Sequence, residues 1–223
     1  MKKRFLTVIL PAALAGLFIG IAGRWLKIPP KTFLTYYFIA GAVFIAALVI
    51  LQFLLLKHYQ KKIRAACDLL EGGEPQAALD RFRSLYEGAR GAYLKTLLAL
   101  DVCAAYCDLK QYDRALEILQ RDEKHCLKGL LKPLYFMNLC FCYFYLGREE
   151  EALALYGRYE KDLHALSFHR EFEANTSILS VYVSVARGET DLARPKLELA
   201  KQIWQSPRFQ EDYRRLEALI HEA

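Results

Sequence analysis

The first 56 residues of the chain contain no acidic side chain, and two long stretches within them, 5–23 and 32–56, carry no charge at all. The hydrocarbon core of a bilayer requires roughly 20 apolar residues in a helix. Both stretches reach about that length, and they are apolar around every face rather than along one stripe. We therefore expect residues 1–57 to form a hairpin of two transmembrane helices, with spans at about 5–23 and 32–56.

Basic residues flank these stretches unequally. They lie at the outer ends of the hairpin (Lys2, Lys3, Arg4, Lys57, Lys61, Lys62 and Arg64) more than in its loop (Arg24, Lys27 and Lys31). Cytoplasmic ends of membrane helices carry the excess of Lys and Arg. The pattern predicts a multi-pass protein of the cell membrane, in contact with bilayer lipid, with its remaining residues in the cytoplasm. The alternative for the first stretch is a cleaved signal peptide, although it exceeds the roughly 7–15 apolar residues of such a segment.

Residues 57–223 lack an excess of either charge, because the net charge of +6 comes from the acid-free first 56 residues. A nucleic-acid-binding domain is expected to show a basic stripe in its folded part. No such stripe is present here. We therefore expect no nucleic-acid partner.

Recognisable catalytic and metal-binding motifs are also lacking. The sequence holds six cysteines but no C-x-x-C pair, and its five histidines are scattered at predicted helix ends and loops. P-loop, Rossmann, G-x-S-x-G and H-E-x-x-H patterns are absent from the sequence. We predict a protein that is not an enzyme, with no catalytic residue, metal or cofactor, and with cysteines that serve as buried apolar side chains.

A repeated helix-turn-helix pattern fills the rest of the chain. In residues 134–156 an aromatic, apolar run ends at Gly147, acids follow, and Ala152 is placed where two helices would cross. The alanine recurs 37 positions earlier at Ala115, a further 37 earlier at Ala78, and 41 later at Ala193. Gly precedes this alanine in three copies and Lys110 does so in the fourth. Such a period indicates stacked helical hairpins that bury their faces against one another.

In these residues the sequence resembles the tetratricopeptide repeat family, whose unit is about 34 residues long. The positions that carry the resemblance are Leu69, Gly73, Ala78 and Phe82; Tyr106, Ala115 and Leu119; Tyr143, Gly147, Ala152 and Tyr156; and Gly188, Ala193 and Leu197. The chain departs from the family in its longer spacing and in lacking the early Trp and closing Pro of each unit. The resemblance implies a scaffold that binds other proteins.

The predicted fold class is all-α: two transmembrane helices, then an α-solenoid of about four such hairpins over residues 58–223, closed by a C-terminal capping helix. Glycine and proline positions divide this part into nine helices. We expect them at 59–72, 75–89, 92–108, 112–124, 131–146, 149–163, 168–187, 191–204 and 208–221.

In the family the first helix of each hairpin lines a concave groove. The equivalent positions on the first helices of the hairpins here imply a partner-binding groove. It includes Leu97, Leu100, Met137, Phe141, Phe144, Tyr145, Ile178, Tyr182 and Val185. Its apolar, aromatic character favours an amphipathic helix of a partner protein, held by anchors at helical spacing. We therefore expect a non-catalytic, membrane-anchored adaptor that binds a partner or assembles a membrane complex. One alternative is a module that handles lipid or a small apolar molecule, and another is that the C-terminal helix covers these side chains as core.

Overall fold

The protein is described by a computed structural model, which defines residues 30–122 and 128–222. Within these ranges every regular element is a helix and no strand occurs. The chain divides into two compact units, residues 1–60 and 61–223. Each unit is considered by itself.

Helix α2 runs from Pro30 to Glu71 and contains the second predicted span, 32–56. Its described large apolar side chains between Tyr36 and Leu54 are exposed. Within the described residues, however, no helix combines the length and the apolar character that a membrane crossing needs. The predicted fold class is therefore wrong in its transmembrane helices. The prediction relied on the length and all-round apolar character of the stretch and on its basic flanks, whereas the helix that contains it continues through a charged second half.

The other predicted span, 5–23, lies outside the described residues. The cleaved-signal alternative concerns the same residues and stays a prediction. So does the predicted location of the protein at the cell membrane.

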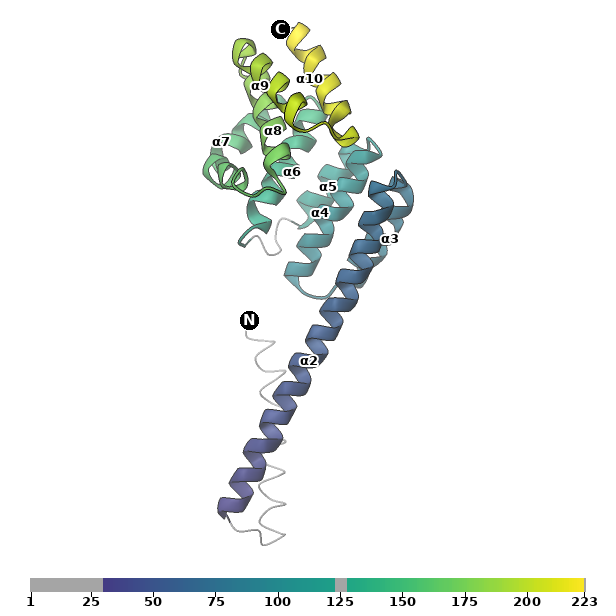
Figure 1. Ribbon diagram of the computed structural model, residues 1–223, viewed down its shortest axis with the longest axis vertical. Coiled ribbons are helices and arrows are strands. Elements are labelled where there is room, and N and C mark those ends of the chain that lie inside the picture. The colour runs from purple at the N-terminus through teal and green to yellow at the C-terminus, as the bar shows by residue number, and fades with distance from the viewer. Residues whose placement is uncertain (1–29, 123–127, 223) are drawn as a thin grey trace. The chain divides into compact units, whose positions relative to one another are not determined.

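Residues 61–223 fold as successive helical hairpins (Figure 1). After the last turns of α2 come α3 (Pro75–Gly88), α4 (Ala92–Asp108), α5 (Tyr112–Asp122), α6 (Leu131–Tyr145), α7 (Glu149–Leu166), α8 (Glu173–Ala186) and α9 (Thr190–Ile203). A short 3-10 helix, η1 (Pro207–Phe209), leads into α10 (Gln210–Glu222). Helix α4 packs on both α3 and α5, α6 packs on α7, and α8 packs on α9. This repeat-like, all-helical arrangement fits an α-solenoid.

Four hairpin turns share one backbone geometry. At Gly73, Lys110, Gly147 and Gly188 the backbone takes a positive φ of 80°, 58°, 70° and 72°. In each turn the next residue donates its backbone N–H to a carbonyl five positions earlier, at 2.9 Å; Arg148 donates to Tyr143 in this way. This pattern is the Schellman motif that ends a helix. The turns thus recur at the positions that the sequence period predicts.

The small residue after each turn is fully buried. Ala78, Ala115, Ala152 and Ala193 each have 0% of their surface exposed. Each donates its backbone N–H to the carbonyl four residues earlier, in the first turn of the second helix. A methyl side chain therefore fills the position where the two helices of a hairpin approach most closely.

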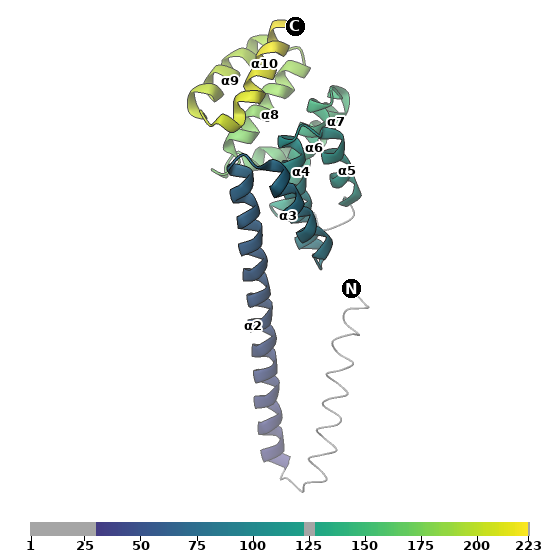
Figure 2. The same ribbon diagram turned by 90° about the vertical axis from the view of Figure 1, so that its right-hand side faces the viewer.

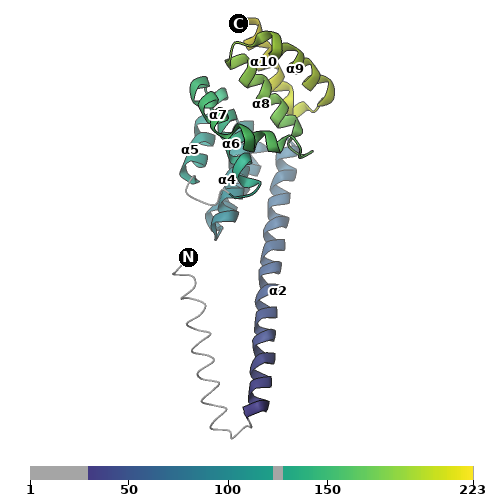
Figure 3. The same cartoon turned by 90° about the vertical axis from the view of Figure 1, so that its left-hand side faces the viewer.

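Helix α10 covers the end of the array and packs on α8 and α9 (Figure 2). Tyr213, Leu216 and Ile220 are buried on its inner face. The Tyr213 hydroxyl donates to the carbonyls of Ala200 and Trp204, at 3.2 and 2.9 Å. In Figure 3 the same three helices, α8 to α10, again lie together.

After α2, two predicted helix starts differ from the observed ones by more than one residue. The helix predicted at 168–187 begins at Glu173, because residues 167–172 form a series of tight turns. The helix predicted at 208–221 begins as η1 and becomes α-helical only at Gln210. The hydroxyl of Ser206 accepts the Arg208 N–H at the start of η1, which favours the tighter turn there.

Candidate functional site

A cavity of about 770 Å³ lies within the 61–223 unit, beside the capping helix. Five regions of the chain line it: the end of α2, the α4–α5 turn, the end of α6, η1 and α10. The lining side chains are Leu70, Glu71, Cys107, Asp108, Lys110, Tyr112, Tyr145, Ser206, Pro207, Arg208, Glu211, Asp212 and Arg215. Its size lies within the roughly 300–1,000 Å³ range of ligand pockets. Charged side chains of both signs face it.

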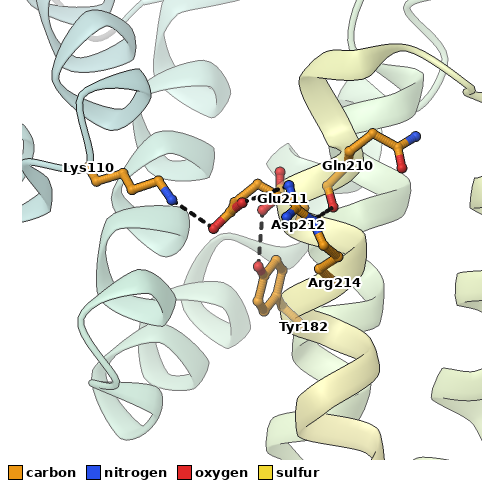
Figure 4. A network of polar contacts seen from close by, with 6 residues as sticks. All are labelled: Lys110, Tyr182, Gln210, Glu211, Asp212 and Arg214. Atoms are coloured by element: carbon orange, nitrogen blue, oxygen red, sulfur yellow. Dashed lines mark hydrogen bonds and ion pairs between the residues drawn. The ribbon is translucent and has the colours of Figure 1, made fainter.

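Asp212 on α10 is the central polar group of one wall. Its Oδ1 accepts hydrogen bonds from the hydroxyls of Tyr145 at 2.7 Å and Tyr182 at 3.0 Å. Burial raises the pKa of Asp212, and the two tyrosine hydrogen bonds oppose that shift by stabilising the carboxylate. Figure 4 shows the Tyr182 ring pointing at this carboxylate. These bonds join α10 to α6 and α8.

Arg215, one turn further along α10, satisfies the end of α6. Its Nη2 donates to the carbonyl oxygens of Phe144 and Tyr145, both at 2.9 Å. The last carbonyls of a helix have no partner within that helix. A cation at this end also complements the helix dipole. Arg215 therefore fixes α10 against α6 at the cavity wall.

Lys110 reaches across the cavity mouth. Its Nζ lies 3.0 Å from Glu211 Oε1, as Figure 4 shows. Both side chains are more than half exposed, at 64% and 54%. An exposed ion pair of this kind contributes about 0–1 kcal/mol. The pair thus connects the α4–α5 turn to α10 only weakly, and a ligand can compete for either partner.

Arg208 is an open cationic group at this site. It is exposed, it lines the cavity, and its guanidinium forms no ion pair within the described residues. Burial raises the pKa of the neighbouring Asp108 carboxyl, and the charge of Arg208 opposes that shift. Among the described residues, Arg208 therefore offers the cavity an unpaired cation next to a carboxylate.

The predicted groove residues lie mostly inside the protein. Leu100, Met137, Phe141, Phe144, Ile178 and Tyr182 are buried, whereas Leu97, Tyr145 and Val185 are partly exposed. The structure brings several aromatic members together: Phe144 stacks on Tyr182, with ring centroids 5.3 Å apart, and Phe141 meets Tyr182 edge-on at 6.1 Å. Of the nine residues, only Tyr145 lines the cavity. Their role in holding a partner stays a prediction.

The capping helix covers part of this aromatic cluster, as the core alternative expected. Four polar cavity residues from η1 and α10 were not predicted as site residues: Arg208, Glu211, Asp212 and Arg215. One signal was available: Lys110 occupies a turn position that glycine fills in the other three copies.

Three cysteines also converge, which the sequence spacing did not reveal. Cys103 and Cys107 lie one turn apart on α4, and Cys142 approaches them from α6. Their sulfur atoms all lie within 4.8 Å of one another, and those of Cys103 and Cys142 are 3.9 Å apart. Cys103 and Cys142 are fully buried, while Cys107 reaches the cavity. Helix packing, not sequence proximity, assembles this cluster.

The three thiols differ in acidity because they hydrogen-bond to one another. Bonds from Cys103 and Cys107 lower the pKa of Cys142. Bonds with Cys107 and Cys142, together with burial, raise the pKa of Cys103. For Cys107 the bond with Cys103 lowers the pKa, but the bond with Cys142 and burial raise it further.

Comparison with family models, curated proteins and solved structures gives no match to this chain. The tetratricopeptide resemblance therefore rests on the residues quoted above.

Proposed function

We propose that the protein is a non-catalytic scaffold of the tetratricopeptide-like kind, which binds a polar segment of a partner protein in the cavity beside α10. The observation that carries this proposal is the composition of the cavity wall. Five separate regions of the chain contribute charged or aromatic side chains to one open space of about 770 Å³. Stacked helical repeats commonly create extended binding surfaces of this kind.

The polarity of the wall favours a peptide over a lipid. Arg208 can donate hydrogen bonds to a carboxylate of the partner, and the exposed Glu71 and Asp108 can bind basic groups. Tyr112 adds an aromatic surface, with its ring 4.7 Å from that of Tyr145. Aromatic side chains and arginine are the residue types that contribute most energy at protein interfaces.

The buried aromatic cluster supports the same choice. The ring of Tyr182 already packs against those of Phe141 and Phe144 inside the array. An apolar ligand would need to displace α10 to reach them, together with the Asp212 and Arg215 bonds that hold it. A partner at the cavity needs no such opening.

Photo-cross-linking tests this proposal in the native cell. A benzophenone amino acid replaces Tyr112, which lines the cavity, and in a matched control it replaces Phe168, which is 79% exposed but outside the cavity wall. We expect position 112, and not position 168, to cross-link to one recurring protein. Combining the probe at 112 with Arg208→Glu should reduce that product several-fold, because the change reverses the free charge.

Equal yields at the two positions, or a product that does not depend on Arg208, would contradict the proposed site. A cross-link from position 112 to lipid instead of protein would favour the module that handles apolar molecules.

A further inference from the structure

The cluster of Cys103, Cys107 and Cys142 has the geometry of a metal site. Thiolate ligands of zinc lie about 2.3 Å from the ion, so two of them in a tetrahedral arrangement are roughly 3.8 Å apart. The sulfurs of Cys103 and Cys142 are 3.9 Å apart. All three sulfurs lie within 4.8 Å of one another, so no separation exceeds the tetrahedral value by more than about 1 Å.

Helix packing orients these ligands. Residues four apart on a helix share one face, so Cys103 and Cys107 both point from α4 toward the same neighbour. That neighbour is α6, which packs on α4 and carries Cys142. Cys140, two residues away on α6, points elsewhere, since its thiol lies 3.9 Å from the Ala152 carbonyl. The three-sulfur set is therefore specific to one side of each helix.

The surroundings suit a cation bound by thiolates. Cys107 lines the cavity while Cys103 and Cys142 lie behind it, so an ion would have access from one side only. Three thiolates around a divalent cation leave a net negative charge. Arg208 lies on the same cavity and its positive charge acts on Cys107.

We propose that Cys103, Cys107 and Cys142 bind one thiophilic d10 metal ion, Zn²⁺ or Cu⁺, with any remaining coordination position directed to the cavity. Soft thiolate ligands select these ions. Binding replaces the protons of the three thiols by one ion and releases those protons to solvent, so the affinity falls as the pH is lowered. An open fourth position is typical of zinc sites with three protein ligands. This proposal is independent of the proposed partner binding.

Metal titration of the full-length chain tests it. The protein is reduced, stripped with a chelator and titrated separately with Zn²⁺, with Cu⁺ under competition from a copper(I) chelator, and with Co²⁺ as a spectroscopic probe. We expect one ion per chain, a higher melting temperature, and a thiolate-to-cobalt charge-transfer band of the intensity that three thiolates give. The Zn²⁺ and Cu⁺ arms identify which ion binds more tightly.

Variants locate the site. Cys142→Ala should reduce the affinity at least tenfold and weaken the cobalt band, while Cys67→Ala, which removes a thiol outside the cluster, should leave both unchanged. Alanine suits position 142 because Ala105 occupies the corresponding place one repeat earlier, 37 residues before it. Cys107→Ser, at the partly exposed ligand, provides a second variant if Cys142→Ala does not fold.

Reduced wild-type protein that binds neither ion would overturn the proposal. So would folded Cys142→Ala or Cys107→Ser protein that binds metal as tightly as the wild type. Loss of metal binding in the Cys67→Ala control would equally exclude the three-cysteine assignment.

Discussion

The second hairpin, α4–α5, and the third, α6–α7, have the same backbone plan but carry different chemistry. Both end their first helix in the same turn, at Lys110 and Gly147, and both bury an alanine five residues later. Yet Lys110 replaces glycine, and Asp101 stands 37 residues before Asn138, at the same place in its helix. The Asn138 amide donates to the Leu134 carbonyl at 2.8 Å. Asp101 instead has a buried Oδ2 with no hydrogen-bond partner in the described part of the chain.

Lys110, in place of glycine at the turn of the second hairpin, does not increase the stability of that turn. A residue with a Cβ in the left-handed region costs roughly 1–2 kcal/mol relative to glycine. The exposed ion pair of Lys110 with Glu211 stabilises the folded state by at most about 1 kcal/mol. The stability of the turn therefore does not account for a lysine at position 110. The side chain of Lys110 lines the cavity. The third hairpin, which follows the repeat more closely, supplies the controls for the Asp101 and overpacking experiments below.

The largest expected effect concerns Asp101. Burial raises its pKa to about 7, above the roughly 3.9 of an unfolded chain. The native state thus holds the proton more tightly, so stability falls as the pH rises from about 4 through 7, by at most about 4 kcal/mol. Asp101→Asn, which imitates the neutral carboxyl, should remove that loss. Urea denaturation of both proteins at pH 5 and pH 8 measures the difference.

The control at the matching position is Asn138→Asp. Here a hydrogen-bond donor is replaced, so this variant should lose stability, and more at pH 8 than at pH 5. If wild type and Asp101→Asn lose equal stability between the two values, Asp101 is not a buried neutral acid and the contrast between the hairpins disappears.

Overpacking the helix crossing should affect both hairpins alike. Ala152→Leu and Ala115→Leu each insert a large side chain at a site with no exposed surface. Each should lower the free energy of unfolding by roughly 1–3 kcal/mol. Ala154→Leu, on the exposed side of α7, is the matched control and should change it little. An unchanged stability in either buried variant would show that the two hairpins do not share one crossing geometry.

The Gly147 turn should lose stability through its backbone alone. No atom lies within 4 Å of the Cβ that Gly147→Ala would add, so no clash contributes. With φ at +70°, the substitution should cost about 1 kcal/mol. Gly147→Asn should cost less, since asparagine tolerates the left-handed region better than alanine. Equal losses for the two variants, measured by urea denaturation, would argue against a backbone origin.

The smallest change is expected at Lys110. Lys110→Gly relieves the backbone, but it removes the ion pair with Glu211 and makes the unfolded chain more flexible, so the net gain should be between 0 and about 1 kcal/mol. High salt screens the pair, and the gain over wild type should therefore grow with ionic strength. Glu211→Gln, which removes the pair and keeps the lysine, should show no gain. A marked loss of stability in Lys110→Gly would mean that the ion pair outweighs the strain.

Sequence reasoning predicted the repeats because they depend on local chemistry. A glycine that ends a helix and an alanine at a helix crossing act within a few residues, so Gly147 and Ala152 could be placed from the sequence. The predicted all-helical, repeat-like arrangement and the existence of a final helix agree with the structure. The predicted membrane crossing at 32–56 does not, because within the described residues no helix is long and apolar enough for one.

The site depends on contacts between distant residues, which periodicity does not encode. Asp212 meets Tyr145 from 67 residues away, and Cys103 meets Cys142 from 39 residues away. The sequence predicted α10 only as a capping helix. In the structure the Asp212 carboxylate of this helix accepts hydrogen bonds from tyrosines of α6 and α8. Only the departure at Lys110 marked this region in the sequence.

The tyrosine bonds to Asp212 also set an order of events during synthesis. The Tyr145 hydroxyl must wait until 67 more residues have been added before its acceptor exists, and that of Tyr182 until 30 more. Until α10 emerges from the ribosome, the aromatic edge formed by α6 and α8 has no cover. Exposed apolar surface of this kind makes a partly folded chain prone to aggregation. The docking of α10 covers this surface and supplies the acceptor for both tyrosine hydroxyls, so it is a late step in folding.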